Sequence, residues 1–224
     1  PRQLQIMYGL RGERRLPEVI LDWLPGYEGA APVRIGNAAL HQRQLDVYGE
    51  LMDALHLARR AGIEPAPEAW QLQCHLLRDL ETTWLEPDAG IWEMRGPPRH
   101  FTHSKVMAWV AFDRAVQGVE RFGLPGPVKR WRALRGAIHA DVCARGWNPA
   151  RRAFTQSYGA STLDAALLMM PLVGFLPPED PRVASTVAAI ERELVRDGLV
   201  FRYRSDEAAA GLPPGAGAFL LRSS

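Results

Sequence analysis

Apolar side chains recur every three or four positions along most of the chain after residue 37, which is the pattern of amphipathic helices. Capping residues or prolines stand at several predicted starts, among them Asn37, Thr102 or Ser104, Ser161 or Thr162, and the pair Asp180-Pro181. The pattern predicts six helices and the start of a seventh, over about 37–61, 67–85, 102–122, 127–145, 161–173, 181–197 and from 218.

The connections between these predicted helices alternate in length. Short ones cover 62–66, 123–126 and 174–179, and long ones cover 86–101, 146–160 and 198–216. Antiparallel hairpins with this alternation place every long loop on the same rim. Helix pairs that start near 37, 102 and 161 repeat about every 60 residues, so the chain is expected to be all-α, a helical solenoid or a closed toroid. A closed ring needs more than three pairs, so we expect the chain to be incomplete at both ends.

Residues 1–36 differ from the helical region 37–224 because they are rich in proline and glycine. We expect them to form a segment of the loop rim, with a short strand where Ile6, Tyr8 and Leu10 alternate with other residues. Trp23 and Tyr27 flank a Leu-Pro-Gly sequence, which is rigid and aromatic and therefore suits the wall of a pocket.

The composition is that of a globular protein, with 47% hydrophobic and 23% charged residues among 224. A net charge of +2, with scattered basic residues, argues against nucleic-acid binding. We expect no transmembrane helix and no signal peptide. Cys74 and Cys143 are expected to be buried thiols in a reducing, cytoplasmic compartment, although a single disulfide stays open.

The densest group of polar and aromatic residues lies in the long loop at 90–102. Glu93 stands there beside Trp92 and close to Arg95. A carboxyl group against an aromatic wall is suited to donate a proton as a general acid. The alternative is a surface glutamate paired with Arg95.

Other candidate residues carry weaker signals. His100 and His103 have a spacing found in zinc sites, but no third ligand is evident, so a structural role is favoured. Arg202 lies between two aromatic residues, which suits a polyhydroxylated or anionic ligand, or a solvated loop. Gln44 and Asp46 are expected either to point to the rim or to cap the first helix. The glycine-rich stretch 211–217 lacks the lysine and hydroxyl residue of a phosphate loop.

Several motifs resemble the bacterial branch of glycoside hydrolase family 15, which includes glucoamylases, glucodextranases and bacterial trehalases. The resemblance runs across essentially all 224 residues. Its motifs are Gly90-Ile91-Trp92-Glu93, Phe101-Thr102-x-Ser104-Lys105, Gln44-Leu45-Asp46-Val47-Tyr48-Gly49-Glu50, Trp23-Leu24-Pro25-Gly26-Tyr27, Phe154-Thr155-Gln156-Ser157-Tyr158 and Arg202-Tyr203.

The resemblance implies that the chain is part of an (α/α)6 toroid in which Glu93 is the catalytic acid and Arg202 contacts the sugar in the innermost subsite. It also implies an inverting mechanism, whose general base would lie beyond residue 224, and no metal or organic cofactor. The other residues expected to line or support the pocket are Trp92, Trp23, Tyr27, Gln44, Asp46 and Arg95.

We therefore expect an α-glucoside hydrolase of the glucoamylase or trehalase type, with the isolated 224-residue chain itself inactive. Its partner would be an α-linked glucoside or oligosaccharide, with the choice among them and the oligomeric state left open. The main alternative is an inactive remnant that binds carbohydrate or another protein through the same rim. A helical toroid unrelated to sugars is the third possibility.

Overall fold

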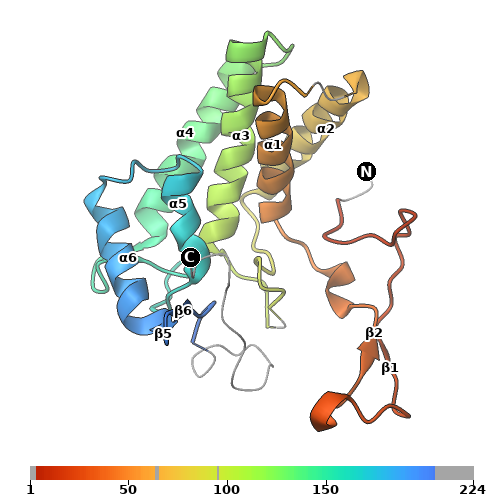
Figure 1. Cartoon of the computed structure of the whole chain (residues 1–224). Helices are drawn as coiled ribbons and strands as arrows, with labels where there is room; N and C mark the ends of the chain where they lie inside the picture. Colours follow the sequence, from red (N-terminus) through yellow and green to blue (C-terminus); the bar gives the residue numbers. More distant parts are fainter. Residues whose placement is uncertain (1–3, 64–65, 95, 205–224) are drawn as a thin grey trace. The chain divides into compact units, whose positions relative to one another are not determined.

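The computed structural model describes residues 4–63, 66–94 and 96–204, and most of its regular structure is helical (Figure 1). The chain divides into two compact units between Gln44 and Leu45. The helices are α1 (Asp46–Arg60), α2 (Pro67–Thr83), α3 (Thr102–Phe122), α4 (Val128–Arg145), α5 (Met169–Leu172) and α6 (Pro181–Leu194), with the 3-10 helices η1 (Tyr27–Gly29), η2 (Ala38–His41) and η3 (Ala165–Leu168). The strands are β1 (Val19–Ile20), β2 (Arg34–Ile35), β3 (Trp147–Asn148), β4 (Ala153–Phe154), β5 (Val195–Arg196) and β6 (Leu199–Val200).

The N-terminal unit is built around the short antiparallel hairpin of β1 and β2, in which Val19 faces Ile35. An ion pair of 3.2 Å between Glu18 and Arg34 supports the hairpin. The strand predicted at Ile6, Tyr8 and Leu10 is wrong, because these residues form no strand and Leu10 is fully exposed. Their alternation therefore does not mark the buried face of a sheet.

The second unit is organised around α3, which is buried on all sides over its first three turns. Every residue from 101 to 113 is buried, including the polar ones. α1 and α4 pack along opposite sides of α3, as Figure 1 shows. A helix enclosed in this way needs apolar residues around its whole circumference, and the sequence Val-Met-Ala-Trp-Val-Ala-Phe at 106–112 supplies them.

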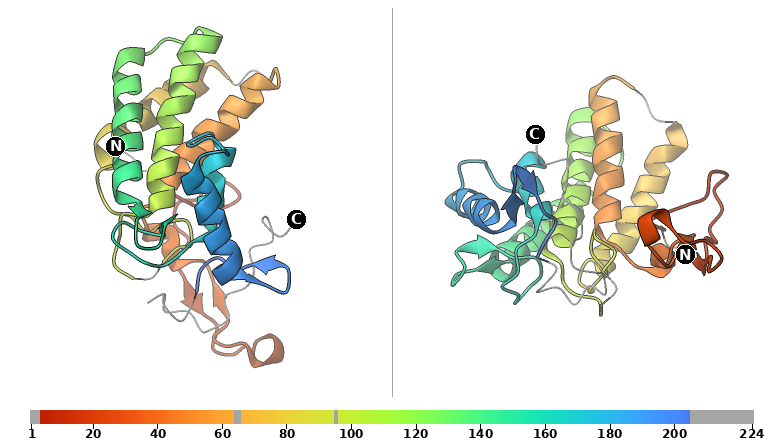
Figure 2. Two further views of the ribbon diagram at one scale, coloured as in Figure 1. Left: turned by 90° about the vertical axis from the view of Figure 1, so that its left-hand side faces the viewer. Right: turned by 60° about the horizontal axis from the view of Figure 1, so that its bottom comes forward.

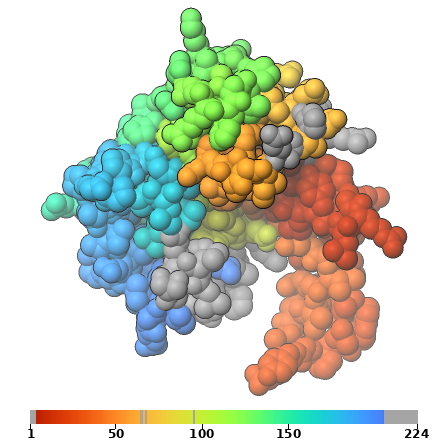
Figure 3. Space-filling model, turned by 45° about the horizontal axis from the view of Figure 1, so that its top comes forward, coloured from red at the N-terminus to blue at the C-terminus, as the bar shows by residue number. Residues whose placement is uncertain are grey.

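α1 and α3 approach each other most closely at Gly49. A Cβ atom added to this glycine would lie 2.2 Å from the backbone oxygen of Met107. Near the C-terminal ends of the same two helices, the guanidinium of Arg59 lies over the ring of Phe122 at 5.7 Å. The surfaces of α1 and α3 are side by side in Figure 3. At one end of the pair, the glycine lets the two backbones come close together, and at the other end a cation–π contact joins the helices.

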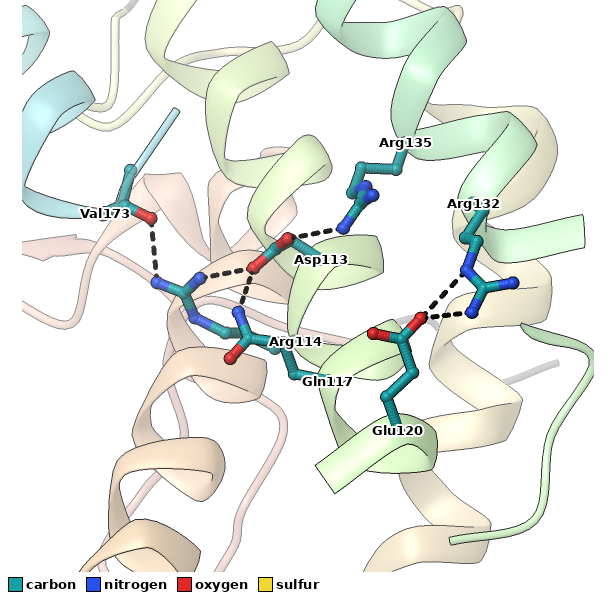
Figure 4. Close-up of polar contacts among 7 residues, drawn as sticks. All are labelled: Asp113, Arg114, Gln117, Glu120, Arg132, Arg135 and Val173. Carbon is teal, nitrogen blue, oxygen red and sulfur yellow. Dashed lines mark hydrogen bonds and ion pairs between the residues drawn. The ribbon is translucent and has the colours of Figure 1, made fainter. Parts of the chain in front are cut away.

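A network of ion pairs joins α3 to its neighbours (Figure 4). The Asp113 carboxylate accepts hydrogen bonds from Arg114 at 2.6 Å and from Arg135 of α4 at 3.0 Å. Arg114 also donates to Asp53 of α1 at 2.6 Å and to the carbonyl of Val173 at 2.9 Å. Because each of these largely buried charges has a partner, the network fixes how three helices and the 173 turn are packed.

The long connections of the second unit meet at one end of its helices (Figure 1, Figure 2). Phe101 bridges to Ser157, and the Thr102 N–H donates to the Gln156 carbonyl at 2.9 Å. The Ala165 N–H donates to the carbonyl of Arg202 at 2.9 Å. Loops that follow α2, α4 and α6 are thus linked by backbone hydrogen bonds. The small hairpins β3–β4 and β5–β6 lie within the second and third of these connections.

Four of the predicted helices are confirmed, at α2, α3, α4 and α6, with Gly123 ending α3 in a left-handed conformation at φ 66°. The helix predicted over 37–61 is interrupted. Asn37 does cap a helix, but it is the four-residue η2, and the chain is extended at Gln42 before α1 begins. The predicted caps Thr102 and Ser104 are wrong, because both residues lie inside α3 and the Thr102 N–H is satisfied by another loop.

The helix predicted over 161–173 is also shorter than expected. It consists of η3 and α5, and its capping residue is Asp164 rather than Ser161 or Thr162. Residues 161–164 form no helix or strand, and the Gln156 N–H donates to the Thr162 carbonyl at 2.8 Å. The seventh helix, expected from Ala218, lies outside the described residues.

Two further expectations concern the membrane and the thiols. Across 4–63, 66–94 and 96–204, no helix combines the length and the hydropathy that crossing a bilayer requires. Cys74 and Cys143 are half-buried free thiols. The structure therefore shows the two cysteines as thiols and not as the disulfide that the sequence left possible.

We predict that Gly49→Ala destabilises the protein by about 1–3 kcal/mol, because the added methyl group meets backbone atoms that cannot move aside. Gly136→Ala in α4 is the matched control, since nothing lies within 4 Å of its added Cβ. It should be neutral or stabilising by up to about 1 kcal/mol. Urea unfolding of the two variants measures the difference, and equal stabilities would contradict the close helix approach.

Candidate functional site

The loop between α2 and α3 is held at its base by a buried lysine. Lys105 is 1% exposed, and its ammonium group donates to the carbonyls of Trp84 and Glu86, each at 2.5 Å. Further along, Asp88 and Arg99 exchange two backbone hydrogen bonds of 2.9 Å. A buried ammonium group is stable only when its donors are satisfied. The first turn of α3 therefore fixes where the loop starts and where it closes.

The tip of this loop is a tight turn that presents Glu93. Gly90 has a φ of 70°, and a Cβ there would meet the ring of Phe101 at 2.9 Å. Glu93 itself has a φ of 53°, which is uncommon for a residue with a side chain, and its N–H donates to the Gly90 carbonyl at 3.3 Å. The Glu93 side chain is exposed. The turn therefore holds a carboxyl group at the surface in a strained conformation of the kind found at functional sites.

Trp92 connects Glu93 to the rest of the site. Its indole N–H donates to the carboxylate of Asp164 at 2.9 Å, and its ring packs against the buried cluster of Met94, Phe101 and Tyr203. The guanidinium carbon of Arg202 lies 5.2 Å from the centre of the same ring. The structure therefore brings Arg202 onto the ring of Trp92, the residue directly before Glu93, although Arg202 and Trp92 are far apart in the sequence.

Asp164 is a fully buried carboxylate that accepts three N–H groups. Besides Trp92, the donors are the Ala166 backbone at 2.8 Å and the Gln156 side chain at 3.1 Å. Burial raises the pKa of Asp164 to about 6, and these hydrogen bonds act in the opposite direction. Because a carboxylate can accept all three donors, the arrangement suits the ionised form.

Two further buried carboxyl groups are those of Asp46, the first residue of α1, and Asp88, in the loop between α2 and α3. Asp46 is 4% exposed, and burial raises its pKa to about 7, with the nearby charge of Asp88 acting in the same direction. Burial also raises the pKa of Asp88, whose carboxylate accepts the Leu45 N–H at 2.9 Å. This contact ties the beginning of α1 to the loop that carries Glu93.

The two histidines of the H-x-x-H spacing have separate environments. His100 stacks on Tyr158 with ring centres 5.9 Å apart, whereas His103 is buried within α3. Among the residues whose placement the structure gives, no three His, Cys, Asp or Glu side chains are grouped to hold a metal ion.

The remaining predicted site residues are not brought to Glu93 by any contact described above. Trp23 and Tyr27 belong to the N-terminal unit, where their side chains are 71% and 84% exposed. Gln44 is buried at the end of that unit. Arg95 lies outside the described residues. The roles assigned to these four residues stay predictions.

Comparison with known proteins places this site in a family. The sequence model of the glycosyl hydrolases family 15 matches residues 1–224. The chain belongs to this family. It is 46% identical over 220 residues to a trehalase of Mycobacterium tuberculosis and 37% identical over 220 residues to a trehalase of Thermoplasma volcanium. Each match covers 98% of this chain, but 32% and 35% of the respective trehalase. The chain therefore spans about a third of the length of the curated relatives that it matches.

Solved structures agree with the fold. A glycosidase in complex with glucose superimposes with a TM-score of 0.65 and 23% identity, over 82% of this chain and 50% of that one. A wild-type glycosidase gives the same values. At this identity the likeness shows the fold alone. The expected all-α architecture is thus confirmed as a mostly helical chain that matches part of a glycosidase fold.

Three residues that bond to the Glu93 loop, or from it to the start of α1, escaped sequence reasoning. Lys105 and Asp88 stood in or beside recognised motifs, but their sequence neighbours give no sign that their partners are backbone groups of a loop and of α1. Asp164 had a detectable signal, because an aspartate directly before the apolar run Ala-Ala-Leu-Leu is a typical helix cap. The sequence does not reveal that the same carboxylate reaches Trp92, 72 residues away.

We predict that stability falls as the pH rises from 3.8 toward about 7, because the folded chain holds a proton on Asp46 over a range where the unfolded chain has lost it. A shift of this size corresponds to at most about 4 kcal/mol. Asp46→Asn should flatten this part of the pH dependence, whereas Glu179→Gln, at an exposed position, should leave it unchanged. The pH dependence of stability is measured from urea unfolding midpoints between pH 3.8 and about 7. If the midpoint changed equally with pH in wild type and Asp46→Asn, the buried, protonated carboxyl group would be contradicted.

Proposed function

We propose that this chain carries the acid side of the active site of an α-glucoside hydrolase of the trehalase type. Glu93 donates a proton to the glycosidic oxygen as the bond to the anomeric carbon breaks, and water adds to that carbon with inversion. The observation that supports this most strongly is the contact of Arg202 with Trp92, the residue directly before Glu93, in a chain 46% identical to a trehalase. The substrate class follows from the trehalase relatives, so trehalose is the first substrate to test.

Each neighbour of Glu93 has a role in this proposal. Trp92 forms an apolar wall for a glucosyl ring, and the Arg202 guanidinium, half-buried over that wall, donates hydrogen bonds to sugar hydroxyls. Asp46, at the start of α1, binds a sugar hydroxyl or supports the pocket wall. Further contacts of the pocket are assigned to Trp23, Tyr27, Gln44 and Arg95.

Inversion also requires a second carboxylate, on the order of 6.5–9.5 Å from the acid, to take a proton from the attacking water. Asp88 and Asp164 are unsuited to this role because each already accepts N–H groups of the protein. We place the second carboxylate outside residues 1–224. In the same proposal, the chain is part of an (α/α)6 toroid. Residues 37–224 contribute three helix pairs and the start of a seventh helix, and residues 1–36 belong to the loop rim.

The deciding experiment compares wild type and Glu93→Gln in the polypeptide as its source makes it. Trehalose and malto-oligosaccharide hydrolysis are followed by released glucose. Loss of a general acid should lower kcat by at least about 10²–10⁴-fold, while binding of the sugar is retained. Glu191→Gln, an exposed glutamate on α6, is the matched control and should keep full activity.

The outcomes separate the proposal from the alternatives. Hydrolysis that survives Glu93→Gln would remove Glu93 from the mechanism. Saturable sugar binding by a wild-type protein that never turns over would instead favour the carbohydrate-binding remnant.

A second prediction concerns substrate binding. Arg202→Met keeps an extended side chain over Trp92 but removes the hydrogen-bond donors. The KM for trehalose should rise by about 10- to 100-fold, as expected for a lost charged hydrogen bond. Arg196→Met, whose guanidinium lies over Phe201 at 5.4 Å in the same hairpin region, is the matched control and should leave KM unchanged. Equal effects of the two variants would contradict a sugar contact at Arg202.

A further inference from the structure

We propose that Asp164 is a positioning residue of the active site, which acts through the indole of Trp92 to hold Glu93 and Arg202 in their working places. This inference rests on the proposed function, since it assigns Asp164 a part in the same reaction. It adds a residue on a third loop, outside the loops that carry the acid and the arginine.

The first argument is the geometry of the carboxylate. Asp164 lies 3% exposed with both oxygens occupied, Oδ1 by Trp92 and Ala166, and Oδ2 by Gln156. A buried acceptor for the indole N–H restricts the ring to one orientation, because turning the ring would leave a buried donor and a buried carboxylate oxygen unmatched. Asp164 therefore fixes the residue directly before Glu93.

The second argument is that the same turn also holds Arg202. The Ala165 N–H donates to the Arg202 carbonyl at 2.9 Å, and the Arg202 guanidinium lies over the Trp92 ring at 5.2 Å. Residues 164 and 165 thus anchor the Trp92 side chain and the Arg202 backbone at once. The distance between the acid and the arginine is set by this turn.

The third argument compares Asp164 with an ordinary helix cap. Asp180 caps α6 in the same way, with Oδ1 accepting the Arg182 N–H at 2.8 Å, and its carboxylate also accepts hydrogen bonds from the Arg182 guanidinium. Asp180 performs its capping role near the surface without any contact to Trp92. Full burial and the bond to an indole 72 positions away are features that capping alone does not require.

The experiment uses Asp164→Ala, Asp164→Asn and the control Asp180→Ala in the polypeptide as its source makes it. Rates are measured on trehalose and on α-glucosyl fluoride, whose fluoride leaves without a proton from a general acid. Asp164→Ala should lower kcat on trehalose by about 10- to 100-fold, as a displaced catalytic group does, and lower kcat on the fluoride much less. A weaker sugar contact at Arg202 would raise KM for both substrates. Asp164→Asn keeps an oxygen for the Trp92 and Ala166 N–H groups, so it should recover most of the trehalose activity. Asp180→Ala should lower the Tm but leave both rates unchanged.

A double-mutant cycle tests whether the effect passes through the indole. Trp92→Phe removes the N–H that Asp164 accepts, so Asp164→Ala should cost little further activity in that background. Equal losses on trehalose and glucosyl fluoride, or a full additional loss in the Trp92→Phe background, would overturn the positioning role.

A measurement that needs no activity keeps this inference separate from the proposed function. In protein labelled with ¹⁵N-tryptophan, the indole signal that disappears in Trp92→Phe identifies Trp92. Its N–H should exchange slowly with solvent in the wild type and at least about tenfold faster in Asp164→Ala. Unchanged exchange would overturn the contact with Asp164. Hydrolysis unaffected by Glu93→Gln would instead overturn the proposed function while leaving the Asp164–Trp92 contact established.

Discussion

The burial of α3 is the constraint on which the second unit depends. Because its first three turns have no solvent-facing side, the charged and backbone polar groups there bond to protein groups instead of water. The Lys105 ammonium finds carbonyls of the preceding loop, the Thr102 N–H finds the Gln156 carbonyl, and Asp113 finds arginines of two helices. The central helix thus organises both the packing around it and the loops at its N-terminal end.

The buried polar groups of this unit are of two kinds, ion pairs between helices and carboxylates that bond to loops. The Asp113 network joins opposite charges on helices and fixes how those helices pack. At the loop end, by contrast, the buried carboxylates of Asp88 and Asp164 accept hydrogen bonds from backbone, indole and amide N–H groups. Hydrogen bonds from neutral donors are directional, so they fix the positions of loops more exactly than a flexible ion pair does.

The sequence predicted the elements that depend on local pattern. The apolar spacing, Pro181 after its capping aspartate and Gly123 after α3 identified four helices, since capping and periodicity are properties of neighbouring residues. It failed where distant contacts override local preference. The Gln156 N–H bonds to the Thr162 carbonyl, and the helix predicted from 161 begins only after Asp164. The Leu45 N–H bonds to Asp88 just before α1, and the helix predicted from 37 is interrupted after η2.

The site follows the same division. Trp92, Glu93 and Arg202 were recognisable because they stand in short motifs, whereas Asp164 acts through a contact across 72 residues that no local pattern encodes. Family resemblance pointed to Trp92, Glu93 and Arg202, and the structure added the contact between Arg202 and the Trp92 ring. What sequence reasoning lacked was the set of side chains that orient the predicted ones.

The anchoring of the Glu93 loop has a consequence for substitutions within it. Lys105 holds its beginning and Phe101 ends it against Ser157, so both ends are fixed by the same helix terminus. Because the two ends are anchored separately from the tip, substitutions at the exposed positions Pro98 and Arg99 would change the surface of the loop without removing either anchor.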